Sequence, residues 1–484
     1  MAGETRVDLA TAHAVHLVGI GGAGMSAIAT VLARLGHRVS GSDQRASPVT
    51  ERLAALGIDV RIGHGVANVG AVDVVAISSA VGADNPEVLA ANAAGIPVVR
   101  RADMLAAVCA VRRTLAIAGT HGKTTTSAMV SLILREAELR PSFIVGGDVN
   151  QLGVGAHWDT GELFVVEADE SDGTFLELGA WGGVVTNVEA DHLDHYGSEA
   201  ALRAAFERFV AGLPGPRVVG IDLPWGRELA TALARRGVPV ATFGRSADAT
   251  WRIAGLETGR RGARFDLWQD DEPLGSVEVG VPGAHNAANA TAAIALCAAA
   301  GAPIDAARRA LAGFGGVARR LTDRGHVAGV ALVDDYAHLP REVEAALGAL
   351  AAGGWSRVVA VFQPHRYSRT AAVGAEFAAA FVDADVVVIT DVYAAGEAPL
   401  EGVDGRVVAD AVRRANPGAD VRYVASRAAL AGEVAAELRP GDVCVSLGAG
   451  DITRLADELL ARLGEPAGEA GEAERAERAG RSAS

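Results

Sequence analysis

Short apolar runs alternate with alanine-rich stretches along most of the chain, and this alternation predicts parallel sheets flanked by helices. The runs that we predict to be strands are residues 13–18, 38–43, 113–119, 330–334 and 357–363. A helix is predicted directly after the first strand, over residues 25–35, where apolar side chains recur at helical spacing. The pattern therefore predicts an α/β fold.

The alternation falls into three segments, which predicts three domains. We place them at residues 1–111, 112–323 and 324–464. The first and third are expected to be Rossmann-like, and the central one is expected to be a mostly parallel sheet of the P-loop ATPase kind. Residues 465–484 form a low-complexity stretch without apolar side chains to bury, so we predict a disordered tail.

Charge and composition exclude several classes of protein. A net charge of −15 over 484 residues argues against a general binder of nucleic acid or anionic membranes. The three cysteines are far apart and odd in number, so a disulfide framework is not expected. The longest apolar run, residues 290–300, is shorter than the roughly 20 residues that cross a bilayer and predicts a buried helix. Because the first residues also lack the apolar core of a signal peptide, we expect a cytoplasmic protein.

A glycine pattern follows the first predicted strand. Gly19, Gly21 and Gly24 stand in G-x-G-x-x-G order before the helix, and Asp43 closes the next strand. Such a loop makes a tight turn and presents free helix amides to a diphosphate. We predict a site for a nucleotide with a diphosphate. The glycines alone do not separate NAD from a UDP-sugar, and a purely structural turn is the alternative.

A second loop contains the only lysine of the chain, Lys123, among 44 lysine and arginine residues. Arginine replaces lysine readily on a surface, but its broad guanidinium does not fit where a compact ammonium meets phosphates in a tight loop. The loop reads GTHGKTTT and lies between a predicted strand and a predicted helix. It is similar to a Walker A loop, although Ile117 occupies the position of the leading glycine. The loop therefore predicts ATP binding.

A magnesium ion bound with ATP needs oxygen ligands besides the Thr124 hydroxyl. Glu167 ends the next predicted strand, and Asn187, Asp191 and His192 follow the one after it. An acid in this place is expected to support the metal. A zinc site formed by His192 and His195 is the alternative, but the chain has no H-E-x-x-H frame or neighbouring cysteines for it.

Nine motifs occur in the order found in the Mur ligases, which the chain resembles from Val15 to Leu463: GIGGAGMSAIA, SGSD, GTHGKTTT, EADESD, TNVEADHLDHY, GAHNAAN, DDYAHLP, FQPHRYSRT and GAGD. The resemblance implies an ATP-dependent ligase of peptidoglycan synthesis. Such an enzyme would phosphorylate the carboxylate of UDP-N-acetylmuramate and join L-alanine to it through an acyl phosphate. It implies ATP and Mg²⁺, with two ions, and a C-terminal domain that closes over both nucleotides. We expect a monomer or weak homodimer.

The resemblance also assigns residues. For ATP they are Gly119, Thr120, His121, Gly122, Lys123, Thr124, Thr125, Asn286, Asn289 and Arg319. For the UDP-sugar they are Gly21, Gly22, Ala23, Gly24, Met25, Ser42 and Asp43. For the amino acid and acyl phosphate they are Tyr336, His338, His365, Arg366 and Arg369. The metal ligands would be Thr124, Glu167 and His192, and the catalytic residues Lys123, His192 and Asp335.

The chain departs from the family at several positions. Leu339 replaces a frequent histidine and Ser368 a common threonine. Some relatives carry a carbamylated lysine near the magnesium, but this chain has no second lysine, and Glu207 is our guess for its replacement. Three rival functions remain open: a sibling ligase that attaches a preformed tripeptide, an NAD-dependent oxidoreductase, and a non-catalytic ATP switch.

Overall fold

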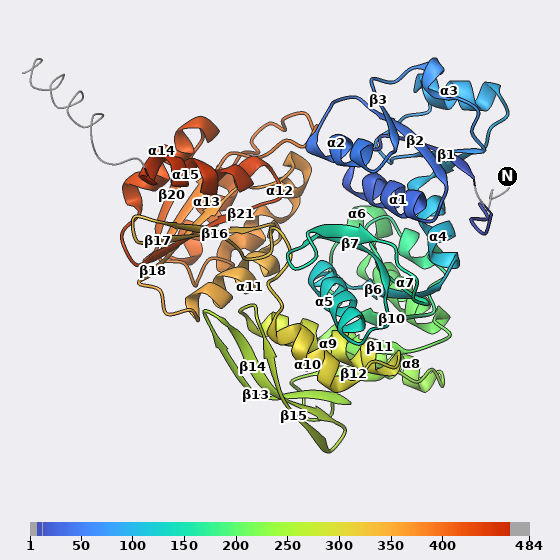
Figure 1. The fold of residues 1–484 in the computed structure, drawn as a ribbon. Helices are drawn as coiled ribbons and strands as arrows, with labels where there is room; N and C mark the ends of the chain where they lie inside the picture. The colour runs from blue at the N-terminus through green and yellow to red at the C-terminus, as the bar shows by residue number, and fades with distance from the viewer. Residues whose placement is uncertain (1–6, 12, 465–484) are drawn as a thin grey trace, which may run out of the picture. The chain divides into compact units, whose positions relative to one another are not determined.

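The computed structural model describes residues 7–11 and 13–464, so the predicted tail lies outside the described residues. The chain is divided into two compact units, Met1–Glu257 with Ala263–Val317, and Thr258–Gly262 with Ala318–Ser484. The first unit contains two sheets and the second contains one (Figure 1). The predicted α/β class is confirmed. The predicted domain boundaries stay a prediction.

The first sheet is parallel throughout and has the order β3-β2-β1-β4-β5. Its strands are β1 Ala14–Val18, β2 Arg38–Asp43, β3 Asp59–Ile62, β4 Val74–Ile77 and β5 Val98–Arg100. Its helices are α1 Ala23–Arg34, α2 Pro48–Ala55, α3 Pro86–Ala93 and α4 Arg101–Ala110. The chain order reverses at β1, and ligands bind at such a point in Rossmann-like sheets.

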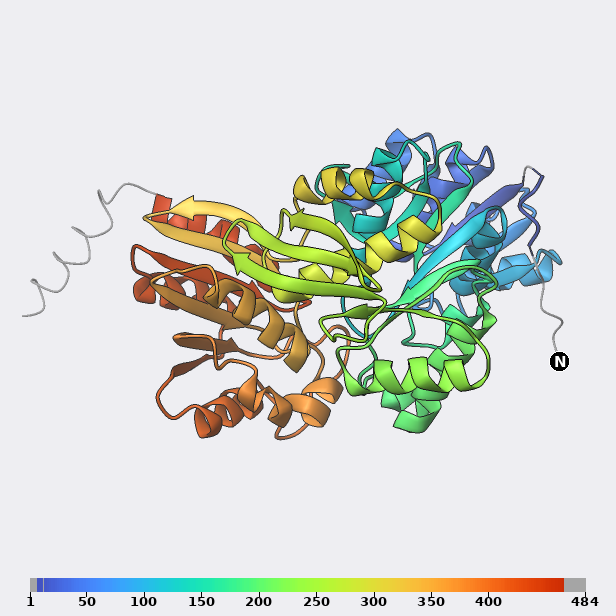
Figure 2. The same cartoon turned by 90° about the horizontal axis from the view of Figure 1, so that it is seen from below.

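The second sheet has the order β15-β14-β13-β12-β11-β10-β6-β9-β7-β8. Its strands are β6 Arg113–Ala118, β7 Ser142–Val149, β8 Val154–His157, β9 Leu163–Glu167, β10 Gly182–Val185, β11 Arg217–Gly220, β12 Ala241–Gly244, β13 Trp251–Gly259, β14 Gly262–Gln269 and β15 Glu272–Val279. Its helices are α5 Lys123–Glu136, α6 Leu193–Tyr196, α7 Glu199–Gly212, α8 Pro224–Arg235, α9 Ala284–Ala299 and α10 Ile304–Ala312. The long strands β13 to β15 extend one edge of the sheet (Figure 2) and were not predicted from the sequence.

The third sheet has the order β16-β17-β21-β18-β19-β20, and only β16 is antiparallel to its neighbour. Its strands are β16 Thr322–Val327, β17 Val330–Asp335, β18 Arg357–Phe362, β19 Val386–Thr390, β20 Asp420–Val424 and β21 Asp442–Leu447. Its helices are α11 Pro340–Ala351, α12 Tyr367–Val373, α13 Arg406–Ala415, α14 Arg427–Glu437 and α15 Leu455–Gly464. This arrangement is Rossmann-like, as predicted.

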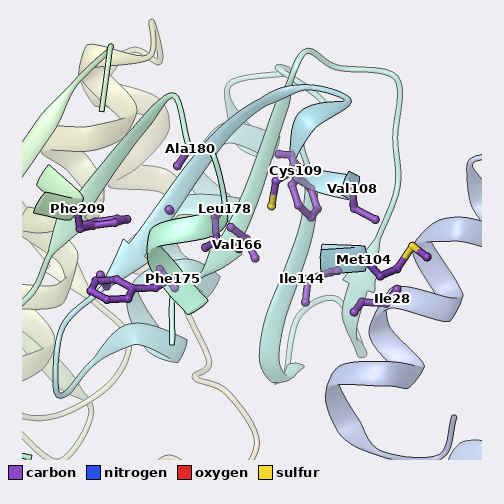
Figure 3. Packing of buried hydrophobic residues seen from close by; sticks show 14 of the residues in the cluster. Ile28, Met104, Val108, Cys109, Ile144, Val166, Phe175, Leu178, Ala180 and Phe209 are labelled. Atoms are coloured by element: carbon purple, nitrogen blue, oxygen red, sulfur yellow. The ribbon is translucent and has the colours of Figure 1, made fainter. Parts of the chain in front are cut away.

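One hydrophobic cluster joins the first two sheets. Ile28 of α1 and Met104 of α4 pack in the same cluster as Ile144 of β7 and Val166 of β9 (Figure 3). These apolar contacts hold the first sheet's helices against the second sheet, which explains why both belong to one compact unit.

The apolar run 290–300 lies mostly within α9, whose middle is buried between other elements, as predicted. Within the described part of the chain, no helix is long and apolar enough to span a membrane.

Candidate functional site

The lysine-containing loop joins β6 to α5 and depends on two glycines. Gly119 has a φ of +127° and Gly122, which precedes α5, has a φ of +83°. A Cβ at Gly119 would also collide with Thr186 Oγ1, and one at Gly122 with Asn289 Oδ1. Both positions therefore require glycine for conformation and for space. The loop ends at the start of α5, where the first amides are free to bind an anion.

Residues that follow β10 hold the middle of this loop. The amide of His121 donates to Asn187 Oδ1 at 2.9 Å, and the amide of Glu189 donates to Thr120 Oγ1 at 3.0 Å. The His121 ring lies 3.1 Å from Glu189 Oε2. Thr125 is buried in the first turn of α5. The ends of β6 and β10 are thus tied together around the loop.

Lys123 lies inside the loop. Its Nζ donates to the carbonyl oxygen of Gly119 at 2.8 Å and lies 2.9 Å from Glu170 Oε2. Burial disfavours the charged lysine, but the carboxylates of Glu170 and Asp169 outweigh this effect and raise the pKa of Lys123 above its usual value. The side chain is therefore a charged ammonium held within the loop.

The two oxygen ligands predicted for magnesium are neighbours. Thr124 Oγ1 donates to Glu167 Oε2 at 3.3 Å, and Glu167 Oε1 accepts from the amide of Gly146 at 2.6 Å. A hydroxyl and a carboxylate are the hard donors that Mg²⁺ prefers, so this pair fits the ion. No cluster of three metal-ligating side chains occurs in residues 7–11 and 13–464, so phosphate and water oxygens would complete the coordination.

His192 stands at the start of α6 with a φ of +53°. Burial raises the pKa of Asp169, but the charge of Lys123, hydrogen bonds from Ser171 and the charge of His192 together lower it. His192 thus acts on the same carboxylate as Lys123. The hydroxyl of Tyr196, in α6, donates to the carbonyl oxygen of Glu170 at 2.6 Å and ties the two loops together.

Asn286 and Asn289, which were predicted to contact ATP, lie one turn apart on α9, and both are buried. Asn289 Nδ2 donates to Asn286 Oδ1 at 3.3 Å. Because a Cβ at Gly122 would meet Asn289, the structure brings this asparagine to the lysine loop. Arg319 belongs to the other unit.

The first glycine loop has the geometry of a nucleotide-binding turn. Gly19 has a φ of +80°, and the amide of Gly21 donates to Asp43 Oδ2 at 2.9 Å. A Cβ at Gly21 would lie only 2.8 Å from that oxygen. Gly22 precedes α1, and Ala23 begins it. The free amides at the start of α1 therefore remain available for a diphosphate.

The side chains of two residues predicted for this site point elsewhere. Met25 is 1% exposed and belongs to the hydrophobic core, so only its backbone could meet a ligand. Its spacing with Ile28 and Leu32 was the sequence signal for burial. The Ser42 side chain is also fully buried, and its hydroxyl donates to Glu87 at 2.5 Å.

Arg101 was not predicted, but it lies beside the glycine loop. A Cβ at Gly24 would be 2.7 Å from its Nη1. The neighbouring Arg100 is bound to Asp103 and Glu177. Within residues 7–11 and 13–464, Arg101 has no such carboxylate partner. An unpaired guanidinium next to a helix amino end is suited to an anion.

A cavity of about 450 Å³ connects these features. Its wall includes Gly24, Arg101, Gly146, Glu167 and Asp169. The cavity therefore extends from the start of α1 to Glu167 at the end of β9 and to Asp169 just after it.

The second unit has its own cluster of basic and aromatic residues. The guanidinium of Arg319 lies 4.8 Å from the ring centre of Tyr336 and donates to the carbonyl oxygen of Gly448 at 2.7 Å. Arg319 Nε also lies 3.4 Å from the buried Asp334. The predicted ATP-contacting arginine is thus held at the ends of β17 and β21.

Two histidines of this cluster are neutral at neutral pH. Burial lowers the pKa of His338, and burial together with the repulsion that a protonated His338 would exert lowers the pKa of His365 to about 4. Their ring centres are 6.1 Å apart. Since His338 Nδ1 lies 3.0 Å from the carbonyl oxygen of Tyr336, it carries the hydrogen and Nε2 is left as an acceptor. The charges of Arg366 and Arg369 act on His365.

Asp335 lies beneath this cluster. Its two carboxylate oxygens accept from the amides of Leu321 and Ala337, each at 2.7 Å. Burial, opposed by the charge of Arg320, raises the pKa of Asp335 to about 6. The carboxylate therefore organises the loops that carry Tyr336 and its neighbours.

Comparisons with known proteins agree with this arrangement. Three family models match consecutive parts of the chain: "Mur ligase family, catalytic domain" at residues 14–113, "Mur ligase middle domain" at 117–297 and "Mur ligase, glutamate ligase domain" at 319–450. The UDP-N-acetylmuramate–L-alanine ligase of Anaeromyxobacter sp. (strain Fw109-5) is 47% identical over 451 residues, which cover 93% of this chain and 97% of the relative. The chain belongs to the Mur ligase family.

Solved structures of Mur ligases share the fold. The UDP-N-acetylmuramate-alanine ligase MurC of Thermotoga maritima aligns with a TM-score of 0.79 and 29% identity, covering 93% of this chain and 99% of that one. A murein peptide ligase from Psychrobacter arcticus 273-4 aligns with a TM-score of 0.68 and 23% identity, covering 94% and 100%. The second likeness is one of fold alone.

The positions at which this Mur ligase departs from its family have other partners. Ser368 Oγ donates to Glu397 at 2.7 Å, and Leu339 precedes α11. Glu207, our guess for the role of a carbamylated lysine, lies on α7 and binds Arg236. Sequence reasoning missed three residues of the site: Asp169, Glu170 and Arg101. For Glu170 the signal was its place in EADESD, three residues after the predicted metal ligand.

Proposed function

We propose that the protein is an ATP-dependent ligase that joins L-alanine to the carboxylate of UDP-N-acetylmuramate in peptidoglycan precursor synthesis. The observation that carries the proposal is the cavity lined by both Gly24 and Glu167. A nucleotide-sugar whose diphosphate binds at α1 can extend through it toward the loop that holds ATP. The relative from Anaeromyxobacter that is 47% identical is named for this activity.

The reaction transfers the γ-phosphoryl group of ATP to the muramyl carboxylate. The amine of L-alanine then attacks the acyl carbon, the amide forms, and phosphate leaves with its bonding electrons. The tetrahedral intermediate is anionic, so catalysis rests on positioning and on charge neutralisation. Both effects would come from the lysine loop. Its amides between Gly119 and Thr125 would position the triphosphate, and the ammonium of Lys123 would neutralise part of its charge.

Magnesium would be held by Thr124 and Glu167, and we propose a second ion near His192. The ions would neutralise phosphate charge. Support comes from the carboxylates around Lys123: Glu167, Asp169 and Glu170 outnumber the one ammonium, so a triphosphate needs additional positive charge to enter.

Arg101 would bind the diphosphate of the UDP-sugar beside the amides of Gly22 to Gly24. Its guanidinium is adjacent to Gly24 and has no carboxylate partner in the described part of the chain. Arginine grips phosphate oxygens with two parallel hydrogen bonds, which favours this ligand.

The second unit would bind the amino acid and the acyl phosphate. Arg366 and Arg369 suit oxyanions, whereas Nε2 of His338 is an acceptor that can take a proton from the alanine ammonium. Asp335 would position this loop. We further propose that the enzyme acts in the cytoplasm as a monomer or weak homodimer.

A coupled assay of ADP release tests the function. We expect release only when UDP-N-acetylmuramate and L-alanine are both present, together with a product that mass spectrometry identifies as the amide. Turnover with the preformed tripeptide in place of L-alanine would make the protein the sibling ligase. Tight NADH binding, measured by fluorescence, without ADP release would favour the oxidoreductase. ATP binding without release would indicate a switch.

A further inference from the structure

A buried carboxylate lies below the end of β2. The Glu87 side chain is 0% exposed and sits in the first turn of α3. Its Oε1 accepts from Asn68 Nδ2 at 2.6 Å and from the amide of Gly65 at 3.1 Å. Its Oε2 accepts from Ser42 Oγ at 2.5 Å and lies 3.3 Å from His16 Nε2. One carboxylate therefore joins β1, β2, the segment after β3 and α3.

This carboxylate determines where the neighbouring protons are. Ser42 has one hydroxyl proton and gives it to Glu87, so His64 Nδ1, 2.9 Å from Ser42 Oγ, must be the donor in that contact. His16 Nε2 donates to Glu87, and its Nδ1 lies 2.9 Å from Ser40 Oγ. This single acceptor thus places a hydrogen on one ring nitrogen of each histidine and fixes the direction of one hydroxyl.

The same end of β2 holds the glycine loop. The carbonyl oxygen of Ser42 accepts from the amides of Gly19 and Ile20 at 2.8 and 2.9 Å. The next residue, Asp43, accepts from the amide of Gly21. A shift of Ser42 would therefore move the loop that we assign to the diphosphate.

We propose that Glu87 is a positioning residue for the UDP-sugar site, which acts through Ser42 and His64 to fix the glycine loop. The inference rests on the proposed function, because it takes the ligand to be a uridine diphosphate nucleotide. Glu87 itself is too deeply buried to touch that ligand. The simpler alternative is that Glu87 only anchors α3 to the sheet.

Calorimetric binding of UDP and of ATP to the full-length chain separates the two roles. We expect Glu87→Gln to weaken UDP binding roughly tenfold, since the amide nitrogen of glutamine cannot accept from Ser42, and to leave ATP binding unchanged. In spectra of ¹⁵N-histidine, we expect the signals of His16 and His64 to change tautomer, with His16→Gln and His64→Gln assigning them. Asn68→Ala, which removes one donor and keeps the carboxylate, should weaken UDP binding less.

Asp73→Asn is the matched control. Asp73 also accepts a backbone hydrogen bond, from Ala14 at 2.7 Å, but at the opposite end of β1. It should bind UDP like the wild type. Wild-type UDP affinity in Glu87→Gln and in Asn68→Ala would overturn the inference alone, as would an equal loss of UDP and ATP binding. A wild-type chain that binds no UDP would instead overturn the proposed function, and this inference with it.

Discussion

The ammonium of Lys123 lies 2.9 Å from the carboxylate of Glu170, which is 1% exposed. The ion pair, together with the hydrogen bond to the carbonyl oxygen of Gly119, keeps the only lysine of the chain inside its loop. A buried charge of this kind is stable only with its partner. The pair therefore holds a charged group ready at the place that we assign to the triphosphate.

Replacing Lys123 with arginine should abolish turnover although the charge is kept. The guanidinium is broader than the ammonium and must enter a space bounded by the carbonyl oxygens of Gly119 and Thr120 and by Glu170. We expect Lys123→Arg to lower kcat at least ~100-fold, the scale of losing one charge-stabilising group. The ADP-release assay measures kcat for the variant and for the wild type.

Arg135→Lys is the control, because Arg135 is an exposed residue at the far end of the same helix. It should turn over normally. Near-normal kcat in Lys123→Arg would show that the loop does not require the compact ammonium.

Glu170→Gln should lower the pKa of Lys123. Glu170 is the main attractive charge on the ammonium, and without it the desolvation of the buried lysine has less opposition. Because the chain has one lysine, protein grown with ¹⁵N-labelled lysine gives a single Nζ signal, whose pH titration reports this pKa directly. Glu136→Gln, at the exposed end of α5, should leave the signal unchanged. An unaltered titration in Glu170→Gln would contradict the pairing.

The sequence predicted most of what depends on neighbours along the chain. β2 was predicted at its observed bounds, and the polar loops after β1, β6, β9 and β17 were found because parallel strands present their carboxyl ends together. Apolar periodicity likewise predicted α1 and the buried run in α9. These features need only local pattern and the general geometry of α/β sheets.

Contacts between distant segments could not be read in this way. Glu87 is 45 positions from Ser42, and nothing in the local sequence distinguishes it from an exposed acid at a helix start. A hint was present in His16, a polar residue within an otherwise apolar strand, which needs a buried partner. Arg100 binds Asp103, three residues away, and the distant Glu177, whereas Arg101 has no carboxylate partner among the described residues. That difference depends on the tertiary structure and could not be predicted.

Arg101→Met should weaken the binding of UDP-containing ligands and spare that of ATP. Loss of a charged hydrogen-bond donor at the diphosphate is expected to cost roughly ten- to hundredfold in affinity. Calorimetry with UDP, UDP-N-acetylglucosamine and UDP-N-acetylmuramate should show the same loss for all three. A loss confined to UDP-N-acetylmuramate would mean that Arg101 contacts the lactyl carboxylate instead. Arg100→Met, whose guanidinium is already bound to Asp103 and Glu177, should keep wild-type affinity.

Glu87 should make the protein sensitive to acid in a defined range of pH. Burial alone would raise the pKa of Glu87, but hydrogen bonds from His16, Ser42, Asn68 and Gly65 outweigh it and hold the pKa at about 2, below the ordinary 4.5. An acid whose pKa is lower in the folded state stabilises the fold above its unfolded pKa. This stabilisation, up to about 3 kcal/mol, is therefore complete above pH 4.5 and is lost as the pH falls toward 2.

Thermal unfolding of the wild type and of Glu87→Gln would be followed at about ten pH values between 2.5 and 7. The difference between the melting temperatures of the two proteins at each pH measures this contribution. At neutral pH the variant should melt lower, because glutamine cannot accept all the hydrogen bonds that the carboxylate accepts. The gap should narrow as the pH falls below about 4.5, since the Glu87 carboxylate of the unfolded wild-type chain then takes up a proton, which stabilises the unfolded state, whereas the folded carboxylate takes up its proton only near pH 2. The neutral glutamine contributes no such pH dependence. A gap that stays constant across this range would mean that the Glu87 carboxylate is not held ionised by its neighbours.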